Sequence, residues 1–443
     1  MRAIGLALLL AATAAVGAGA AGAAPGGGAA TRATPPGPAR SAAAWSIPTA
    51  YQADALSSRL DRQMARVGSG ASAYVVDLNT GASLFSQRST VARIPASVEK
   101  LYTMTTALLR FGPQGRLATR VYAPQPPDAA GILRGNLYLR GGGDPTFGSS
   151  SFIRRNYDGQ GATVGALVHA VIASGGLKQL QGHVVGDESF LDSRRGGPRT
   201  GYGYDSDIEG DLSGLAFDRG ARQESGTARA PTPADFASDR FSHALRTGGV
   251  HVSQRTRTGR TPPNSVLLAQ ALSPPLRTLV AMTLGPSDNF FAEMLLKDLG
   301  ATFGGHGSTP AGAQVVSGQI AALGIHPTVV DGSGLSRSDH TSPRQIVALL
   351  SKLRSLPIGP AVIGALPVAG STGTLAHRMR GTAAQGRCQA KTGTLNYVSN
   401  LAGYCRAADG HTLAFAFLMN SVDVSTAHSA QDAMASALAR YDG

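Results

Sequence analysis

Charge, aromatic side chains and cysteine are all scarce in this chain. Of 443 residues, 15% are charged, 6% are aromatic and two are cysteine. A disordered chain combines high charge with few apolar residues, so the low charge and the 42% hydrophobic content exclude one that is largely disordered. Lysine is rarer still, since only five lysines accompany 35 arginines. The length predicts two or three domains.

A long apolar run occurs only at the N-terminus. Residues 1–24 contain one arginine, an apolar stretch and then small residues, which is typical of a secretory signal peptide. Residues 25–45 are rich in Ala, Gly and Pro and predict an unstructured tether. A retained membrane anchor is the alternative, but glycines break the run and it is short for a membrane span. We therefore expect an exported protein that acts outside the cytoplasm, in the periplasmic space or cell wall or after secretion.

The two cysteines predict one disulfide in an exported chain. Cys388 and Cys405 lie in segments that are expected to form neighbouring antiparallel strands, at equal distances from a turn near Asn396-Tyr397. The pair would then cross between these strands. The spacing and the lack of nearby ligand residues exclude a zinc site.

The net charge of +13 comes almost entirely from arginines that are spread along the chain. No basic run with interleaved aromatic residues occurs, so a nucleic-acid partner is not expected. Anionic wall polymers or lipid headgroups at a membrane surface are the candidate partners of this charge. A basic surface without any partner is the alternative.

The periodicity predicts a multi-domain α/β protein. A hairpin is expected over 71–89, a helix over 96–113, helices within 274–299, and a three-stranded meander followed by a helix at the C-terminal end. Between 118 and 265, short strands alternate with Gly- and Pro-rich turns. We predict one catalytic domain made of 46–117 and 266–443, an antiparallel sheet flanked by helices, with a β-rich insertion over 118–265.

Three short motifs carry candidate chemistry, and the first pairs Ser97 with Lys100. Residues three apart share a helix face, so the two side chains project together near the helix start. A serine needs a base to act as a nucleophile, and a desolvated lysine can lose its proton near neutral pH whereas an arginine cannot. A lysine at this position, in a chain that otherwise uses arginine, indicates a titratable amine. An N-cap serine beside a surface lysine is the alternative.

The other two motifs are Ser287-Asp288-Asn289, at a loop-to-helix junction, and Lys391-Thr392-Gly393-Thr394, on a strand. The hydroxyl of the first can relay a proton, and its amide can hold a peptide carbonyl. The lysine of the second offers positive charge to a carboxylate, and its glycine lets the backbone approach a substrate. Taken singly, an ordinary N-cap cluster explains the first motif better, and a strand that ends in a turn is a plausible alternative for the second.

S-x-x-K, S-D-N and K-T-G in this order resemble the signature of penicillin-binding proteins and serine β-lactamases. The large insertion and the segments GGGDPTF (141–147), DGSGLSRSD (331–339) and LPVAGSTGTLAHRM (366–379) resemble one group of them in particular. That group is the low-molecular-mass class C penicillin-binding proteins, the D-alanyl-D-alanine carboxypeptidase/endopeptidases of peptidase family S13. The resemblance runs from about residue 45 to the end of the chain.

The resemblance implies a reaction on peptidoglycan stem peptides, with β-lactams as covalent inhibitors. Ser97 would attack the carbonyl of the penultimate D-Ala, with Lys100 as base. Ser287, hydrogen-bonded to Lys391, would return the proton to the leaving amine. Asn289 would hold the acyl side chain. No metal or organic cofactor is implied.

The third motif is implied to bind the C-terminal end of the substrate. Lys391 and Thr392 would bind the terminal carboxylate, and Gly393 would let the strand approach. The backbone N–H groups of Ser97 and Thr394 would form the oxyanion hole.

Asp187 and Asp192 are weaker candidates. An acidic residue of the inserted region lies near the distal amino group of the substrate in this family, which makes Asp192 a possible distal contact; turn aspartates are the alternative. A β-lactamase or esterase of the same fold and a non-catalytic peptidoglycan-binding homologue also remain open. A Ser-His-Asp hydrolase is not supported, because no G-x-S-x-G motif occurs.

Overall fold

The computed structural model describes residues 50–220 and 232–443. The whole region before the first helix, including the predicted signal peptide (1–24) and the predicted tether (25–45), lies outside the described residues. In the part of the chain that is described, no helix is both long and apolar enough to cross a membrane.

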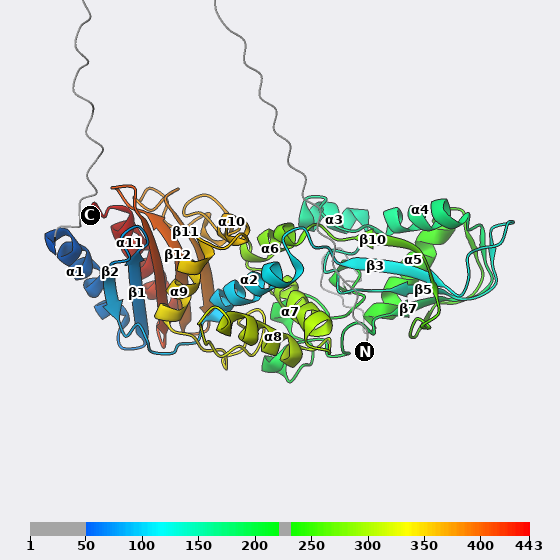
Figure 1. The fold of residues 1–443 in the computed structure, drawn as a ribbon, viewed down its shortest axis with the longest axis horizontal. Coiled ribbons are helices and arrows are strands. Elements are labelled where there is room, and N and C mark those ends of the chain that lie inside the picture. The colour runs from blue at the N-terminus through cyan, green and yellow to red at the C-terminus, as the bar shows by residue number, and fades with distance from the viewer. Residues whose placement is uncertain (1–49, 221–231) are drawn as a thin grey trace, which may run out of the picture. The chain divides into compact units, whose positions relative to one another are not determined.

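The first sheet is antiparallel and draws its strands from both ends of the chain, in the order β11-β12-β13-β1-β2. Figure 1 shows the early strands in blue beside the late strands in orange and red. The predicted hairpin and the predicted meander are therefore confirmed as parts of one sheet. Its strands are β1 (Ala71–Asp77), β2 (Ser83–Gln87), β11 (Cys388–Leu395), β12 (Val398–Arg406) and β13 (Thr412–Asn420).

Nearly every residue of β12 and β13 is buried, because helices cover both faces of this sheet. The helices α1 (Ala50–Val67) and α11 (Val424–Ala439) share one apolar cluster with the sheet, and α9 (Pro343–Leu353) packs on the sheet within another. Burial on both faces explains why Leu413–Met419 reads as a continuous apolar run without alternation.

The second apolar cluster also surrounds a group of helices that includes α2, in which the first nine residues are buried. In α7, every residue from Phe290 to Gly300 is buried, so this helix forms the centre of the group. A 3-10 turn (Ala96–Glu99) leads directly into α2. The helices of the group are α2 (Lys100–Phe111), α6 (Leu276–Leu284), α7 (Asn289–Phe303), α8 (Thr309–Ala321) and α10 (Gly359–Gly364).

The inserted region has its own five-stranded mixed sheet, in the order β10-β3-β5-β7-β9, and a small parallel sheet, in the order β4-β6-β8. Because β10 pairs with β3, this sheet extends to Leu272, past the boundary predicted at residue 265. Its helices are α3 (Ser150–Tyr157), α4 (Val164–Gly175) and α5 (Pro233–Thr247). Its strands are β3 (Ala118–Ala123), β4 (Ile132–Leu133), β5 (Leu137–Arg140), β6 (Gln179–Leu180), β7 (Val184–Asp187), β8 (His251–Val252), β9 (Arg257–Thr258) and β10 (Val266–Leu272).

Part of the inserted region belongs to the core of the helical group. Side chains from α3 and from the segment 191–216 are buried in the same cluster as α2 and α7. The segment 191–216 therefore forms part of the surroundings of the N-terminus of α7. The residues concerned are Phe152, Ile153, Tyr157, Leu191, Ile208, Leu212 and Ala216.

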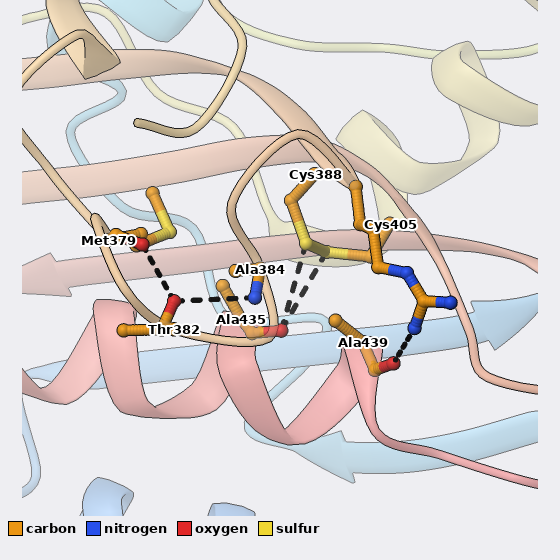
Figure 2. Close-up of a disulfide and its surroundings, with 8 residues drawn as sticks. Met379, Thr382, Ala384, Cys388, Cys405, Ala435 and Ala439 are labelled. Atoms are coloured by element: carbon orange, nitrogen blue, oxygen red, sulfur yellow. Dashed lines mark hydrogen bonds between the residues drawn. A yellow bond between two sulfur atoms is a disulfide. The ribbon is translucent and has the colours of Figure 1, made fainter. Parts of the chain in front are cut away.

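Cys388 and Cys405 are directly opposed in the register of β11 and β12, and they form a disulfide (Figure 2). Their Cα atoms are 4.0 Å apart. Both sulfurs also lie near the carbonyl oxygen of Ala435 in α11, at 3.7 and 3.9 Å. The disulfide thus ties the edge strand of the sheet to its neighbour, three residues from Lys391.

Candidate active site

Ser97 and Lys100 lie at the start of α2, where the preceding 3-10 turn directs both side chains the same way. Ser97 Oγ is 2.9 Å from Lys100 Nζ. The turn is entered through Ala96, whose φ of 46° is unusual for a residue other than glycine. Strain of this kind persists only where the surroundings hold it in place.

Three neighbours hold this turn. Asn400 on β12 donates from Nδ2 to the carbonyl oxygens of Ile94 and Pro95, at 3.0 and 2.7 Å. Gly393 lies against the same backbone, since a Cβ there would be 2.6 Å from Pro95 O and 3.2 Å from Ser97 N. A Cβ on Gly334 would likewise be 1.9 Å from Ala96 O. A larger residue fits at neither position unless the neighbouring backbone shifts.

The S-D-N motif adjoins this turn at the start of α7. Asp288 is the N-cap, and its Oδ1 accepts a hydrogen bond of 2.9 Å from Phe291 N. Ser287 has a φ of 69°. Asn289 Oδ1 is 2.6 Å from Lys100 Nζ. The predicted loop-to-helix junction is confirmed. Asp288 caps the helix while the next residue, Asn289, contacts Lys100.

The K-T-G motif reaches the same place from β11. Lys391 Nζ donates to Ser287 Oγ at 2.8 Å and to its neighbour's carbonyl, Thr392 O, at 2.9 Å. Thr392 Oγ1 is 2.9 Å from Thr374 Oγ1. The three motifs, which lie far apart in the sequence, therefore form two serine–lysine pairs, Ser97 with Lys100 and Ser287 with Lys391.

Burial governs the charge of both lysines. Complete burial lowers the pKa of Lys100 from 10.5 to about 8, and the surrounding carboxyls, Asp331 foremost, oppose that shift. Burial, together with the nearby Lys100, also holds the pKa of Lys391 well below its usual value. Arginine at either position would stay charged.

The surroundings of Lys100 include buried carboxyls that sequence patterns did not single out. Glu293 on α7 accepts from Gly332 N and Ser333 N at 3.0 and 2.8 Å, and Ser333 O in turn lies 2.8 Å from Lys100 Nζ. Burial raises the pKa of Glu293 to about 8 and also raises the pKa of Glu99. The segment DGSGLSRSD thus supplies a hydrogen-bond acceptor to the lysine, which its sequence alone did not reveal.

A cavity of about 780 Å³ opens beside the motifs. Asn289 and Thr394 contribute to its wall, together with charged side chains of both signs and with neutral polar and apolar residues. Part of the wall is the inserted segment 198–209, so the insertion contributes to the site. The charged residues in the lining are Arg199, Asp207, Glu209 and Arg337.

Asp187 and Asp192 lie outside the lining of this cavity. Asp187 is buried and accepts from Ser189 N and Thr261 N at 2.9 and 2.8 Å. Asp192 accepts a hydrogen bond of 2.6 Å from Lys297 Nζ. These contacts are structural, and the distal contact for Asp192 stays a prediction.

No group of three or more His, Cys, Asp or Glu side chains among residues 50–220 and 232–443 is arranged to hold a metal ion.

An antiparallel sheet flanked by helices, with two serine–lysine pairs where sheet and helices meet, defines a serine hydrolase of the penicillin-binding class. The chain belongs to the D-Ala-D-Ala carboxypeptidase 3 (S13) family, whose model matches residues 52–212 and 208–441. It is a serine-type carboxypeptidase, and the predicted family and enzyme class are confirmed.

Relatives and solved structures agree with this assignment. The chain is 30% identical to a D-alanyl-D-alanine carboxypeptidase of Actinomadura sp. (strain R39), over 85% of this chain and 82% of that protein. It is 29% identical to carboxypeptidase DacB of Mycolicibacterium smegmatis, over 82% and 79% of the two proteins. The crystal structure of penicillin binding protein 4 (dacB) from Haemophilus influenzae matches with a TM-score of 0.71 at 20% identity, covering 85% of this chain and 97% of that one. The structural match shows the shared fold.

Proposed function

We propose that this enzyme cleaves the D-Ala-D-Ala terminus of peptidoglycan stem peptides through an acyl-enzyme on Ser97. The observation that carries the proposal is the position of Lys100 Nζ, which lies within 2.9 Å of Ser97 Oγ, Asn289 Oδ1 and Ser333 O. A neutral amine has two hydrogens and one lone pair. It can donate to Asn289 Oδ1 and Ser333 O, two oxygens that only accept, and its lone pair then faces the Ser97 hydroxyl.

In the first step, Ser97 Oγ attacks the carbonyl carbon of the penultimate D-Ala while its proton passes to Lys100. The N–H groups of Ser97 and Thr394 stabilise the oxyanion that forms. The close approach of Gly393 to the backbone of Ser97 supports this role, because it brings the strand and the turn together.

In the second step, the C–N bond breaks and the leaving amine takes a proton through Ser287. The hydrogen bond from Lys391 to Ser287 supports this relay. Lys391 and Thr392 bind the terminal carboxylate of the substrate. Water then hydrolyses the ester on Ser97 and restores the free serine.

The charged cavity supports a peptide substrate that carries ionisable groups. Its wall holds acidic and basic side chains, and it begins at Asn289, which we assign to the acyl side chain of the substrate. We propose peptidoglycan as the macromolecular substrate, both as a carboxypeptidase and as a DD-endopeptidase. This places the enzyme outside the cytoplasm, where it meets anionic wall polymers at most peripherally.

We also propose that β-lactams acylate Ser97. Intact mass after mixing with benzylpenicillin, for wild type and Ser97→Ala, tests this directly. A stable adduct on the wild type alone is expected. Rapid hydrolysis without an adduct would indicate a β-lactamase, and neither adduct nor hydrolysis would indicate a non-catalytic homologue. Release of D-Ala from a stem pentapeptide, compared with cleavage of a cross-linked dimer, separates the two peptidase activities.

A further inference from the structure

The inserted region contacts the S-D-N motif directly, through an arginine that no motif contains. Arg219 donates from Nη2 to Asp288 Oδ2, and each of the two side chains is only 12% exposed. The other oxygen of Asp288 caps α7 by accepting from Phe291 N. Both oxygens of this carboxylate are therefore held, one by the helix and one by the insertion.

Arg219 is itself fixed from several sides. Its Nε donates to Tyr157 Oη at 2.6 Å, and its guanidinium carbon lies 5.2 to 5.4 Å from the rings of Tyr157, Phe290 and Phe291. The preceding residue, Asp218, accepts from Ser149 N at 2.7 Å. The guanidinium donates to Tyr157 and Asp288 at once while it lies beside these rings, an arrangement that a lysine could not reproduce.

A second tie from the insertion acts on the next residue of the motif. Asn289 donates from Nδ2 to Asp207 O at 2.7 Å, which leaves its Oδ1 turned toward Lys100 Nζ. The insertion thus fixes the residues on either side of the peptide bond that joins Asp288 to Asn289. Ser287, just before them, has a φ of 69°, a conformation that requires support from its surroundings.

We infer that Arg219 is a positioning residue for the carboxypeptidase reaction, acting through Asp288 to hold Ser287 and Asn289 against the two lysines. The inference rests on the proposed function of the motifs. It makes the insertion part of the catalytic apparatus, in addition to its contribution to the cavity. A general packing role for Arg219 is the competing explanation.

The test measures acylation by benzylpenicillin, with rapid quenching and intact mass, in Arg219→Gln and Arg219→Lys. At saturating benzylpenicillin the observed rate constant is that of the acylation step, so effects on binding are measured separately. Misplacement of reacting groups by about 1 Å can cost about 100-fold, so we expect Arg219→Gln to slow the acylation step by about that factor and Arg219→Lys by about 10-fold.

Arg378→Gln is the matched control. Arg378 pairs with Asp432 and is 14% exposed, but it contacts α11 and none of the motifs. Both variants lose a partly buried ion pair, so we expect similar falls in melting temperature, with normal acylation in Arg378→Gln only. Tyr157→Phe, which removes one hydrogen bond from Arg219 and leaves Asp288 paired, should fold well and slow acylation a few-fold.

A double-mutant cycle with Asp288→Asn decides between positioning and packing. If Arg219 acts through Asp288, Arg219→Gln adds little to the slowing already caused by Asp288→Asn. Additive effects, or an Arg219→Gln protein that acylates as fast as Arg378→Gln, would overturn the inference. A wild-type protein that is never acylated would overturn the proposed function as well, so the two failures are distinguishable.

Discussion

Replacing Lys100 by arginine tests the central chemical claim, that a neutral lysine activates Ser97. With a pKa of about 8, about one tenth of Lys100 is neutral at pH 7. An unperturbed lysine with a pKa of 10.5 would be neutral roughly 300-fold less often. Burial thus supplies most of the base that is available at neutral pH.

The sign of the pH dependence follows from the role of the lysine. Only the neutral amine accepts the proton of Ser97, so the acylation rate should rise as pH increases and level off above about pH 8. Below that value it should fall about tenfold per pH unit. In Lys100→Arg the group stays charged at all accessible pH values, and we expect a loss of about 100- to 10,000-fold.

The assay is the rate of acylation by benzylpenicillin from about pH 5.5 to about pH 9.5, a range of about 4 units that includes the pKa of Lys100. Lys297→Arg is the matched control, because Lys297 is also a fully buried lysine on a neighbouring helix. Lys391 also has a lowered pKa, so a rise of the acylation rate with pH that persists in Lys100→Arg would belong to another group. That result, or a rate within about tenfold of wild type, would refute the assignment of Lys100 as base.

Three further predictions follow from packing. Gly393→Ala should slow acylation at least about tenfold with the fold retained, because its Cβ would be 2.6 Å from Pro95 O; a normal rate would contradict the close approach. Replacing Cys388 and Cys405 by alanine should lower the free energy of unfolding by about 3 kcal/mol in urea, and an unchanged midpoint would argue against the disulfide. Burial raises the pKa of Glu99, so wild type loses stability as pH rises from the unfolded pKa toward the folded one. The melting temperature of Glu99→Gln minus that of wild type should therefore be larger at pH 8 than at pH 5.

Local sequence was sufficient for the elements that carry the motifs. The helix that starts at Lys100, the cap at Asp288 and the strand with Lys391 each follow from short-range patterns. The disulfide pairing also follows from a local feature, since a hairpin turn sets the register that places Cys388 opposite Cys405.

Local sequence did not reveal the partners of those motifs. Lys100 contacts Asn289 and Ser333, which lie 189 and 233 residues away, and no periodicity links such positions. The same holds for β10, whose pairing with β3 moved the edge of the inserted sheet past the predicted boundary.

The sequence by itself determined which side chains can do the chemistry. They are two lysines, in a chain that otherwise uses arginine, and the serines of the S-x-x-K and S-D-N motifs. Only the tertiary structure decided their charge and direction. A pKa depends on burial and on neighbours from every packed element, and Lys100 is buried by segments from distant parts of the chain. The role of Arg219 likewise arises only because the insertion packs against the start of α7.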